Sequence, residues 1–256
     1  MKLDRLSIDA IATGVGVVVI AVLSLVLPAV SPRAASLVLD WGSAIFPYPF
    51  TIQNLMLLLF FLGIGELVSR WRDGSAEAAY LARGYLPEDE RTVLQAHDLG
   101  EIRRRLQPDL AVEGDGAFLP RMINRCVLQF LSSKSIDGTS GMLSSLCDVY
   151  FHRVDLRYTI LRYLAWVIPT LGFIGTVVGI AASLTVIQSQ GKNPDLAKIT
   201  ATLGVAFDTT MLALVLSAIL VFVMHVVQER EERNLNRAME YCVTNLVNRL
   251  YSTETA

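Results

Sequence analysis

Residues 163–188 read YLAWVIPTLGFIGTVVGIAASLTVIQ, and residues 199–227 read ITATLGVAFDTTMLALVLSAILVFVMHVV. The first stretch contains no charged residue, and the second contains only Asp208. About 20 apolar residues are needed to cross the hydrocarbon core of a bilayer, so each stretch predicts a transmembrane helix. The link between them, SQGKNPDLAK (189–198), is short and rich in turn residues. The two stretches therefore predict a hairpin of antiparallel membrane helices.

Two earlier segments, Asp9–Ala29 and Phe50–Val68, are similarly apolar. Hydrophobic residues make up 53% of the 256 residues and charged residues 18%, where soluble domains carry about a quarter. We read the first segment as a retained anchor, because no small-residue cleavage site follows it. The link between the two segments contains three prolines and interfacial aromatic residues, so we expect it to be broken. The predicted fold is an all-α, polytopic membrane protein with four transmembrane helices.

The distribution of Lys and Arg residues predicts the orientation of the chain in the membrane. Four crossings place both termini and the central region on one side, and that side carries 19 of the 22 Lys and Arg residues. The positive-inside rule makes that side cytoplasmic. We therefore expect a multi-pass protein of a bacterial inner membrane with both termini in the cytoplasm. The net charge of -2 gives no basic field that would indicate nucleic acid as a partner.

The chain divides into four expected parts. These are residues 1–69 with the first two spans, 70–162 as a cytoplasmic helical region, 163–227 as the membrane hairpin and channel core, and 228–256 as a cytoplasmic C-terminal helix. The three cysteines are far apart in sequence and indicate reduced thiols rather than disulfides.

Five local expectations concern the cytoplasmic parts. Proline and acidic residues at Pro87–Glu90 are typical of a first helical turn. Apolar residues at helical spacing predict another helix from Pro120. Ser132–Gly141 is expected to be a polar turn. Because no Pro or Gly interrupts them, we expect Met142–Arg162 to continue into the third span and the fourth span to continue as a helix to Leu250.

Both hairpin helices carry a stripe of small residues along one side. At 100° per residue, one direction of the third span collects Pro169, Gly172, Thr176, Gly179 and Ser183. The matching stripe of the fourth span consists of Thr202, Ala206, Thr210, Ala213 and Ser217, with Thr209 just beside it. Counted from the inner ends, Thr176 lies about 20 Å deep and Thr210 about 25 Å deep, so we expect the two hydroxyls at nearly the same level.

Two interpretations of these stripes stay open. Small residues let membrane helices approach closely, and Ser and Thr hydroxyls bond within or between helices. This packing role accounts fully for Gly175 and Gly179. It accounts less well for a threonine at one depth on each stripe, which would also suit a cation, a water chain or a polar residue of a partner.

The run PTLGFIGTVVG (169–179), followed by a short link and LGVAFDTTMLALVLSAI (203–219), resembles the membrane hairpin of the MotA/TolQ/ExbB ion-channel family. The resemblance covers Ile168–Val227, and the GTVVG element at Gly175–Gly179 is its most specific part. Two spans, a cytoplasmic helical region and then the hairpin are similar to the order in MotA-type flagellar stator subunits. The TolQ and ExbB branch has three crossings.

The resemblance implies a pentameric ring around two copies of a single-span partner of the MotB/TolR/ExbD type. The partner's membrane aspartate would carry the ion, H⁺ or Na⁺, and ion flow would drive mechanical work. The family's two threonines fall on Thr176 and Thr210, which with the neighbouring Thr209 form the expected ion pathway. Two departures are Ala213, where glycine is frequent, and Ile219, where proline is usual, so the fourth span should be straighter. Packing at the channel core is assigned to Pro169, Gly172, Gly175, Gly179, Ser183, Ala206, Ala213 and Ser217.

Asp208 is open to three roles. A carboxylate within a membrane span is costly and is a functional hypothesis by default. Its direction on the helix is about 160° from the small-residue stripe. It therefore suits a structural contact, an ion relay or a partner contact, without sharing the Thr210 lining.

We consider four functions for this sequence. They are an ion-conducting channel subunit, a solute transporter subunit, a membrane-anchored enzyme and a non-conducting scaffold. Transporters usually have more spans and repeated halves. No clustered catalytic residues indicate an enzyme, and we expect no cofactor or metal site. The channel interpretation is the one we favour, with the scaffold and transporter as alternatives. The machine it would drive, flagellar, TonB-like, Tol-like, gliding or defensive, is left open.

Overall fold

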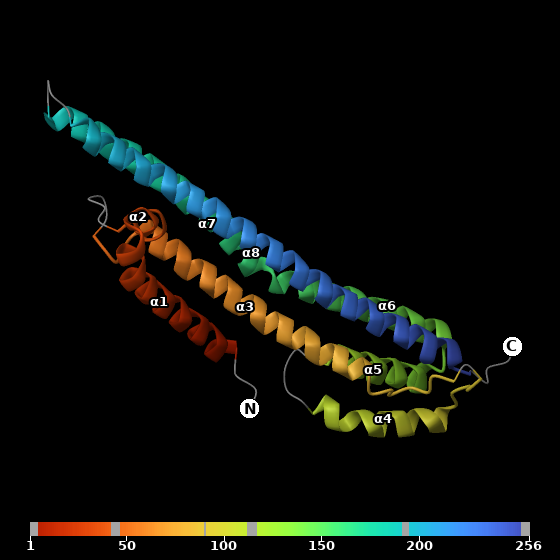
Figure 1. Ribbon diagram of the computed structural model, residues 1–256. Helices are drawn as coiled ribbons and strands as arrows, with labels where there is room; N and C mark the ends of the chain where they lie inside the picture. The colour runs from red at the N-terminus through yellow and green to blue at the C-terminus, as the bar shows by residue number, and fades with distance from the viewer. Residues whose placement is uncertain (1–4, 42–46, 90, 112–116, 191–194, 252–256) are drawn as a thin grey trace. The chain divides into compact units, whose positions relative to one another are not determined.

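The computed structural model describes residues 5–41, 47–89, 91–111, 117–190 and 195–251, and these are almost entirely helical (Figure 1). The all-α prediction is confirmed. In the described part, extended pairing is limited to one isolated parallel bridge between Leu94 and Leu250. The elements are α1 (Arg5–Val30), α2 (Pro32–Leu39), α3 (Ile52–Leu81), α4 (Ala96–Leu110), α5 (Phe118–Ser133), α6 (Ile136–Arg157), α7 (Thr159–Gln190), α8 (Leu196–Asn245) and the 3₁₀ helix η1 (Val247–Arg249).

Within the residues that the structure describes, four stretches of helix are long and apolar enough to cross a membrane, which confirms the four predicted spans. They lie within Ala10–Val30, Ile52–Leu81, Ile136–Gln188 and Leu196–Arg249. The chain forms two compact units. Unit 1 consists of residues 1–69 and 159–225, and unit 2 of residues 70–158 and 226–256.

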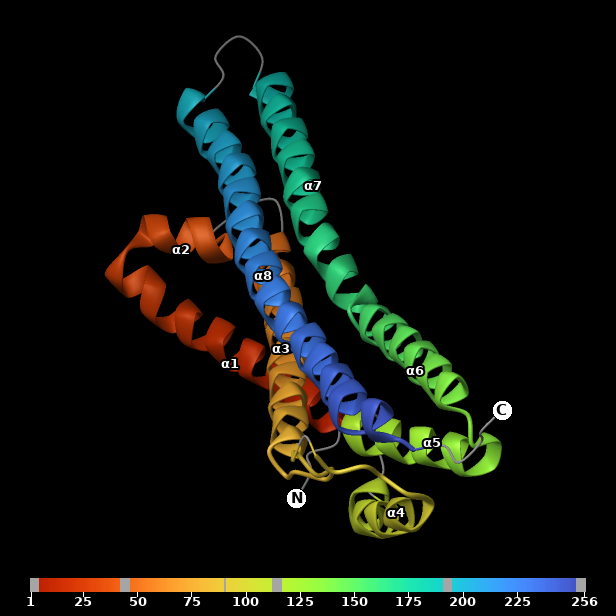
Figure 2. The ribbon, with the colours of Figure 1, turned by 90° about the vertical axis from the view of Figure 1, so that its right-hand side faces the viewer.

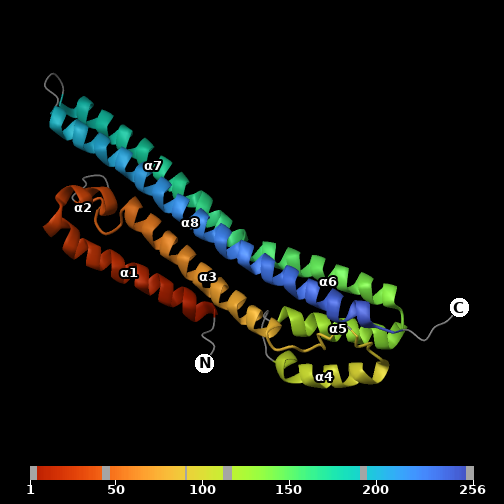
Figure 3. The same cartoon turned by 45° about the vertical axis from the view of Figure 1, so that its right-hand side comes forward.

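Unit 1 is built from α1, α2, the first part of α3, α7 and the first part of α8. The antiparallel helices α1 and α3 touch at glycines, since a Cβ on Gly65 would overlap Ala12 and one on Gly16 would lie 3.0 Å from the Cβ of Phe61 (Figure 3). A Cβ on Gly63 would lie 2.9 Å from Leu220, so α3 also packs closely on α8.

The hairpin of α7 and α8 extends beyond the N-terminal end of α3 (Figure 1). Gln53, the second residue of α3, is hydrogen-bonded to Thr209 of α8. The residues Leu196–Asp208 of α8 precede that level, which corresponds to about 20 Å of helix. Thr209 is therefore level with the end of α3 rather than with its middle.

The link after α1 is not broken as expected, because part of it forms the helix α2 (Figure 2). Pro32 occupies the first helical turn, where its missing N–H costs nothing. The Ser31 hydroxyl caps the helix by accepting a hydrogen bond from the Ala34 N–H at 3.3 Å. Pro32, at which the sequence predicts a break, thus begins a helix.

Unit 2 contains α4, α5, α6, η1 and the last parts of α3 and α8, with α5 packed against both α4 and α6. Its core buries all three cysteines of the chain, Cys126, Cys147 and Cys242, as free thiols. Burial raises the pKa of the Cys126 thiol to about 12.

Two local predictions in unit 2 are wrong. Pro87–Asp89 do not begin a helix, because their carbonyl oxygens accept hydrogen bonds from the buried Arg249 guanidinium, at 2.6 Å for Pro87. Glu90 and the hairpin link residues 191–194 lie outside the described residues. The expected polar turn at 132–141 is only two residues long, since the Ser135 hydroxyl accepts from the Gly138 N–H at 3.1 Å and starts α6 early.

The predicted helical continuations hold in part, because α6 and α7 are interrupted and α8 ends early. The helix α8 stops at Asn245 instead of Leu250, and Leu250 is extended in the backbone bridge to Leu94. The residues before and after Tyr158 are helical, and Tyr158 itself separates α6 from α7. Its backbone N–H donates to Asp155 at 3.1 Å, a tighter turn than the α-helical one. The helix α8 runs without interruption for 50 residues, consistent with the absence of proline at Ile219.

Candidate functional site

The two hairpin helices meet along three glycines of α7, namely Gly172, Gly175 and Gly179. A Cβ on the first or second would overlap a side chain of α8, and a Cβ on Gly179 would lie 2.5 Å from a Cβ of α8. The contacted residues of α8 are, in the same order, Ala213, Thr209 and Ala206. The two small-residue stripes therefore face each other, and the absence of side chains allows the backbones to approach.

We expect Gly179→Val to destabilise the α7–α8 contact by about 2 kcal/mol, because overpacking a close-packed interface forces the backbone to move. The added Cβ would also lie 3.1 Å from the Cα of Ala206, so no side-chain rotation relieves the clash. Thermal unfolding of the detergent-solubilised protein measures the effect. Gly204→Ala on α8 is the matched control, since nothing lies within 4 Å of its Cβ position. Equal stability of the two variants would contradict the tight-contact reading.

The hydroxyls of the two stripes donate to backbone carbonyls. Thr210 donates across the interface to the Gly172 carbonyl at 2.8 Å, and Ser217 donates to the Ala165 carbonyl at 3.0 Å. Within α7, Thr176 donates to Phe173 at 2.6 Å. Ser183 and Thr202 also donate to carbonyls of their own helices.

Thr176 and Thr210 are near each other but not at the same level. Because Thr210 bonds to Gly172, Thr176 lies one helical turn, about 6 Å, further toward the α7–α8 connection. Depth counted from the inner ends fails here because the two assumed ends, Tyr163 and Val227, are not at one level. Ala165 is level with Ser217, to which it is hydrogen-bonded, ten residues before Val227. Both threonine side chains are half-buried, and each oxygen keeps its lone pairs as acceptors.

Thr209 has a different environment, because its side chain is buried between three helices. It is 2% exposed, donates to the Val205 carbonyl at 2.7 Å and accepts a hydrogen bond from the Gln53 amide at 3.1 Å. Gln53 was not among the predicted site residues. A glutamine within the apolar segment 50–68 was the available signal, but its partner is 156 residues away.

Asp208 lies on the open side of α8. It is half-buried, and no hydrogen bond or ion pair joins it to another described residue. Phe207 and Met211 beside it are exposed, and no atom lies within 4 Å of a Cβ placed on Gly204. Asp208 thus faces away from Gly175 and the α7 contact, which leaves its three candidate roles open. Pro169 is half-buried within α7.

Unit 2 contains a buried carboxylate between helices. Glu77 lies in the charged last part of α3, beyond the apolar segment 50–68, and is 7% exposed. Its carboxylate accepts hydrogen bonds from the N–H groups of Ala117 and Phe118, the latter at 3.0 Å, and so caps α5 from a neighbouring helix. Burial raises the pKa of Glu77 to about 7, against the lowering effect of these bonds and of Arg157.

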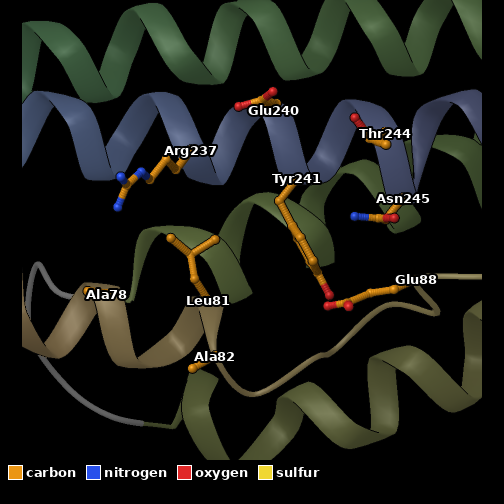
Figure 4. Close-up of a pocket in the computed structure, with 9 residues that line it drawn as sticks. All are labelled: Ala78, Leu81, Ala82, Glu88, Arg237, Glu240, Tyr241, Thr244 and Asn245. Atoms are coloured by element: carbon orange, nitrogen blue, oxygen red, sulfur yellow. The ribbon is translucent and has the colours of Figure 1, made fainter.

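A shallow groove of about 590 Å³ also lies in unit 2, between the ends of α3 and α8 (Figure 4). Tyr241 reaches from α8 toward Glu88 in this groove, and its hydroxyl accepts a hydrogen bond from the Leu86 N–H at 3.0 Å. The groove is open and carries both signs of charge. Among the described residues no cluster of His, Cys, Asp and Glu suits a metal ion.

The sequence was compared with models of known protein families and with curated proteins. Residues 116–240 match the MotA/TolQ/ExbB proton channel family. The match extends well beyond the hairpin and confirms the family assignment made from it. Residues 116–240 are thus similar to a family of proton channels, and the four apolar helices indicate a multi-pass membrane protein. A search of curated proteins gave no match.

Proposed function

We propose that the chain is an ion-conducting subunit of an inner-membrane channel that converts an H⁺ or Na⁺ gradient into mechanical work. It would act with a single-span partner of the MotB/TolR/ExbD type whose membrane aspartate carries the ion. Both termini and unit 2 would lie in the cytoplasm. The proposal is supported by the family of residues 116–240 and by the geometry of two threonines.

The observation that carries the proposal is the orientation of the hydroxyls of Thr176 and Thr210. Each donates its proton to a carbonyl of α7. A hydroxyl whose proton is already bonded offers only lone pairs, which attract a cation or a protonated water. Half-buried oxygens at adjacent turns therefore give an ion two ligands without rearrangement of the protein.

We further propose a homo-oligomeric ring, most simply a pentamer, with the hairpins inside. The sides of α7 and α8 that face away from each other are apolar and exposed, including Phe173, Val177, Phe207 and Val215. Neighbouring copies, the partner or lipid would cover these side chains. Mass measurement of the solubilised complex tests this part, and a stable monomer or dimer would disprove it.

The decisive experiment is ion flux in vesicles that contain the chain with or without its co-purified partner. We expect a dye-reported H⁺ or Na⁺ flux only when both proteins are present. An assembled complex without flux for either ion would favour the scaffold, for which the facing small-residue stripes already suffice. Uptake of a solute rather than an ion would favour the transporter.

A further inference from the structure

We propose that Gln53 is a positioning residue for the ion pathway. Its amide holds the Thr209 side chain in one orientation, and that side chain sets the spacing of α7 and α8 beside Thr176 and Thr210. This inference rests on the proposed function and assigns a role in it to α3.

The first step is the burial of Gln53. Its side chain is 1% exposed, and the amide Nε2 donates to the Thr209 Oγ1 at 3.1 Å. A buried amide without a partner is costly in an apolar environment, so the bond constrains both residues. Gln53 is thereby tied to α8 rather than to its own helix.

The second step is the rotamer of Thr209. A threonine in a helix divides between two χ1 rotamers, one of which lets its hydroxyl bond the carbonyl four residues earlier. Thr209 adopts that bonded form, with Val205 as the acceptor at 2.7 Å. The Gln53 amide then donates to the same oxygen, so it stabilises this rotamer over the other.

The third step is the position of the Thr209 methyl group. In this rotamer the methyl carbon lies so close to Gly175 that a Cβ on the glycine would overlap it. The methyl group is therefore the spacer between the two helices at this level. Gly175 and Thr209 are the chain neighbours of Thr176 and Thr210, so a change in the spacer alters the separation of the two hydroxyl oxygens.

A simple helix contact predicts a different phenotype from a positioning residue. Loss of a contact lowers the amount of assembled complex and the maximal flux in proportion. Altered spacing of ion ligands changes the ion concentration at which flux is half-maximal. The dependence of flux on ion concentration therefore separates the two roles.

The test uses the full-length chain with its partner in vesicles. We expect Gln53→Met to raise the half-saturating ion concentration about fivefold. Thr209→Ser keeps the hydroxyl but removes the methyl spacer, and it should give a similar shift. In the double variant, Gln53→Met should add little, because the group it orients is already absent. Gln188→Met, a substitution of the same kind at an exposed position of α7, should leave the half-saturating concentration unchanged.

The outcomes separate this inference from the function on which it rests. No flux in the native complex would overturn both. Flux in the native complex, with an unchanged half-saturating concentration in Gln53→Met and Thr209→Ser, would overturn the positioning role alone. Shifts that add fully in the double variant would also overturn it. If Gln53→Met does not assemble, Gln53→Asn decides in its place, because its shorter side chain keeps a polar amide in the buried site but withdraws it from Thr209.

Discussion

Thr176→Val and Thr210→Val should each lower ion flux through the reconstituted complex about 30-fold while the complex stays assembled. Valine has the shape of threonine but no lone pairs, so a partly dehydrated cation loses a ligand that hydrocarbon cannot replace. A polar group without its partner costs about 2 kcal/mol in proteins, which corresponds to that factor in rate. Flux in vesicles with the partner present measures the effect.

The complex should still assemble, because the lost hydrogen bonds contribute little to its stability. The bond from Thr176 stays within α7, and interhelical bonds in membranes average about 0.6 kcal/mol. Thr170→Val is the matched control, since its hydroxyl also donates to a carbonyl of its own helix, that of Trp166. Asp208→Asn should affect assembly or partner docking at least as much as flux. Normal flux in both Thr176→Val and Thr210→Val would return these threonines to a packing role.

Glu77→Ala should destabilise unit 2 by about 3 kcal/mol. It removes a buried acceptor of two N–H groups at the start of α5, and each buried N–H group left without a partner costs about 1–3 kcal/mol. All three cysteines of the chain are buried in unit 2, so the rate at which a thiol reagent labels the full-length protein reports the opening of this unit. Labelling should accelerate strongly in Glu77→Ala. The exposed Glu101→Ala is the control, because its carboxylate pairs with Arg105 on its own helix and is not buried.

The same residue predicts a pH dependence with a definite sign. The pKa of Glu77 rises from 4.5 to about 7 on burial, so the folded state holds this proton more tightly than the unfolded chain. The stabilisation is present in full below pH 4.5 and is lost as pH rises through about 7. Thiol labelling should therefore accelerate over this range, after correction for reagent chemistry, and Glu77→Gln should flatten the profile. An unchanged profile in Glu77→Gln would refute the assignment.

The membrane hairpin was predictable because the features that define it lie within one continuous stretch of sequence. Crossing a bilayer requires a long apolar run, and close helix packing requires small residues at helical spacing. Both signals are contained in residues 163–227, and the facing glycines of α7 lie where the spacing placed them. The family resemblance rested on the same residues.

What could not be predicted depends on contacts between distant segments. Pro32 and Pro87 are both prolines near a possible helix start, yet only Pro32 begins one. A cap at Ser31 is available to the first, whereas the carbonyl of the second is taken by Arg249 from the far end of the chain. The pairing of Gln53 with Thr209 is equally distant, so no local pattern indicates it.

The division of the chain between the two units has a consequence for its synthesis. Unit 2 is formed by residues 70–158 and 226–256, which are separated by the entire membrane hairpin. At about 5–20 residues per second, the first portion waits several seconds for the second to be made. During this time Leu94 lacks the backbone bridge to Leu250, and the carbonyl oxygens of Pro87–Asp89 lack the Arg249 guanidinium. The nascent protein should therefore depend on prompt insertion of the hairpin, and a ribosome stalled between residues 160 and 225 would leave a binding site for chaperones.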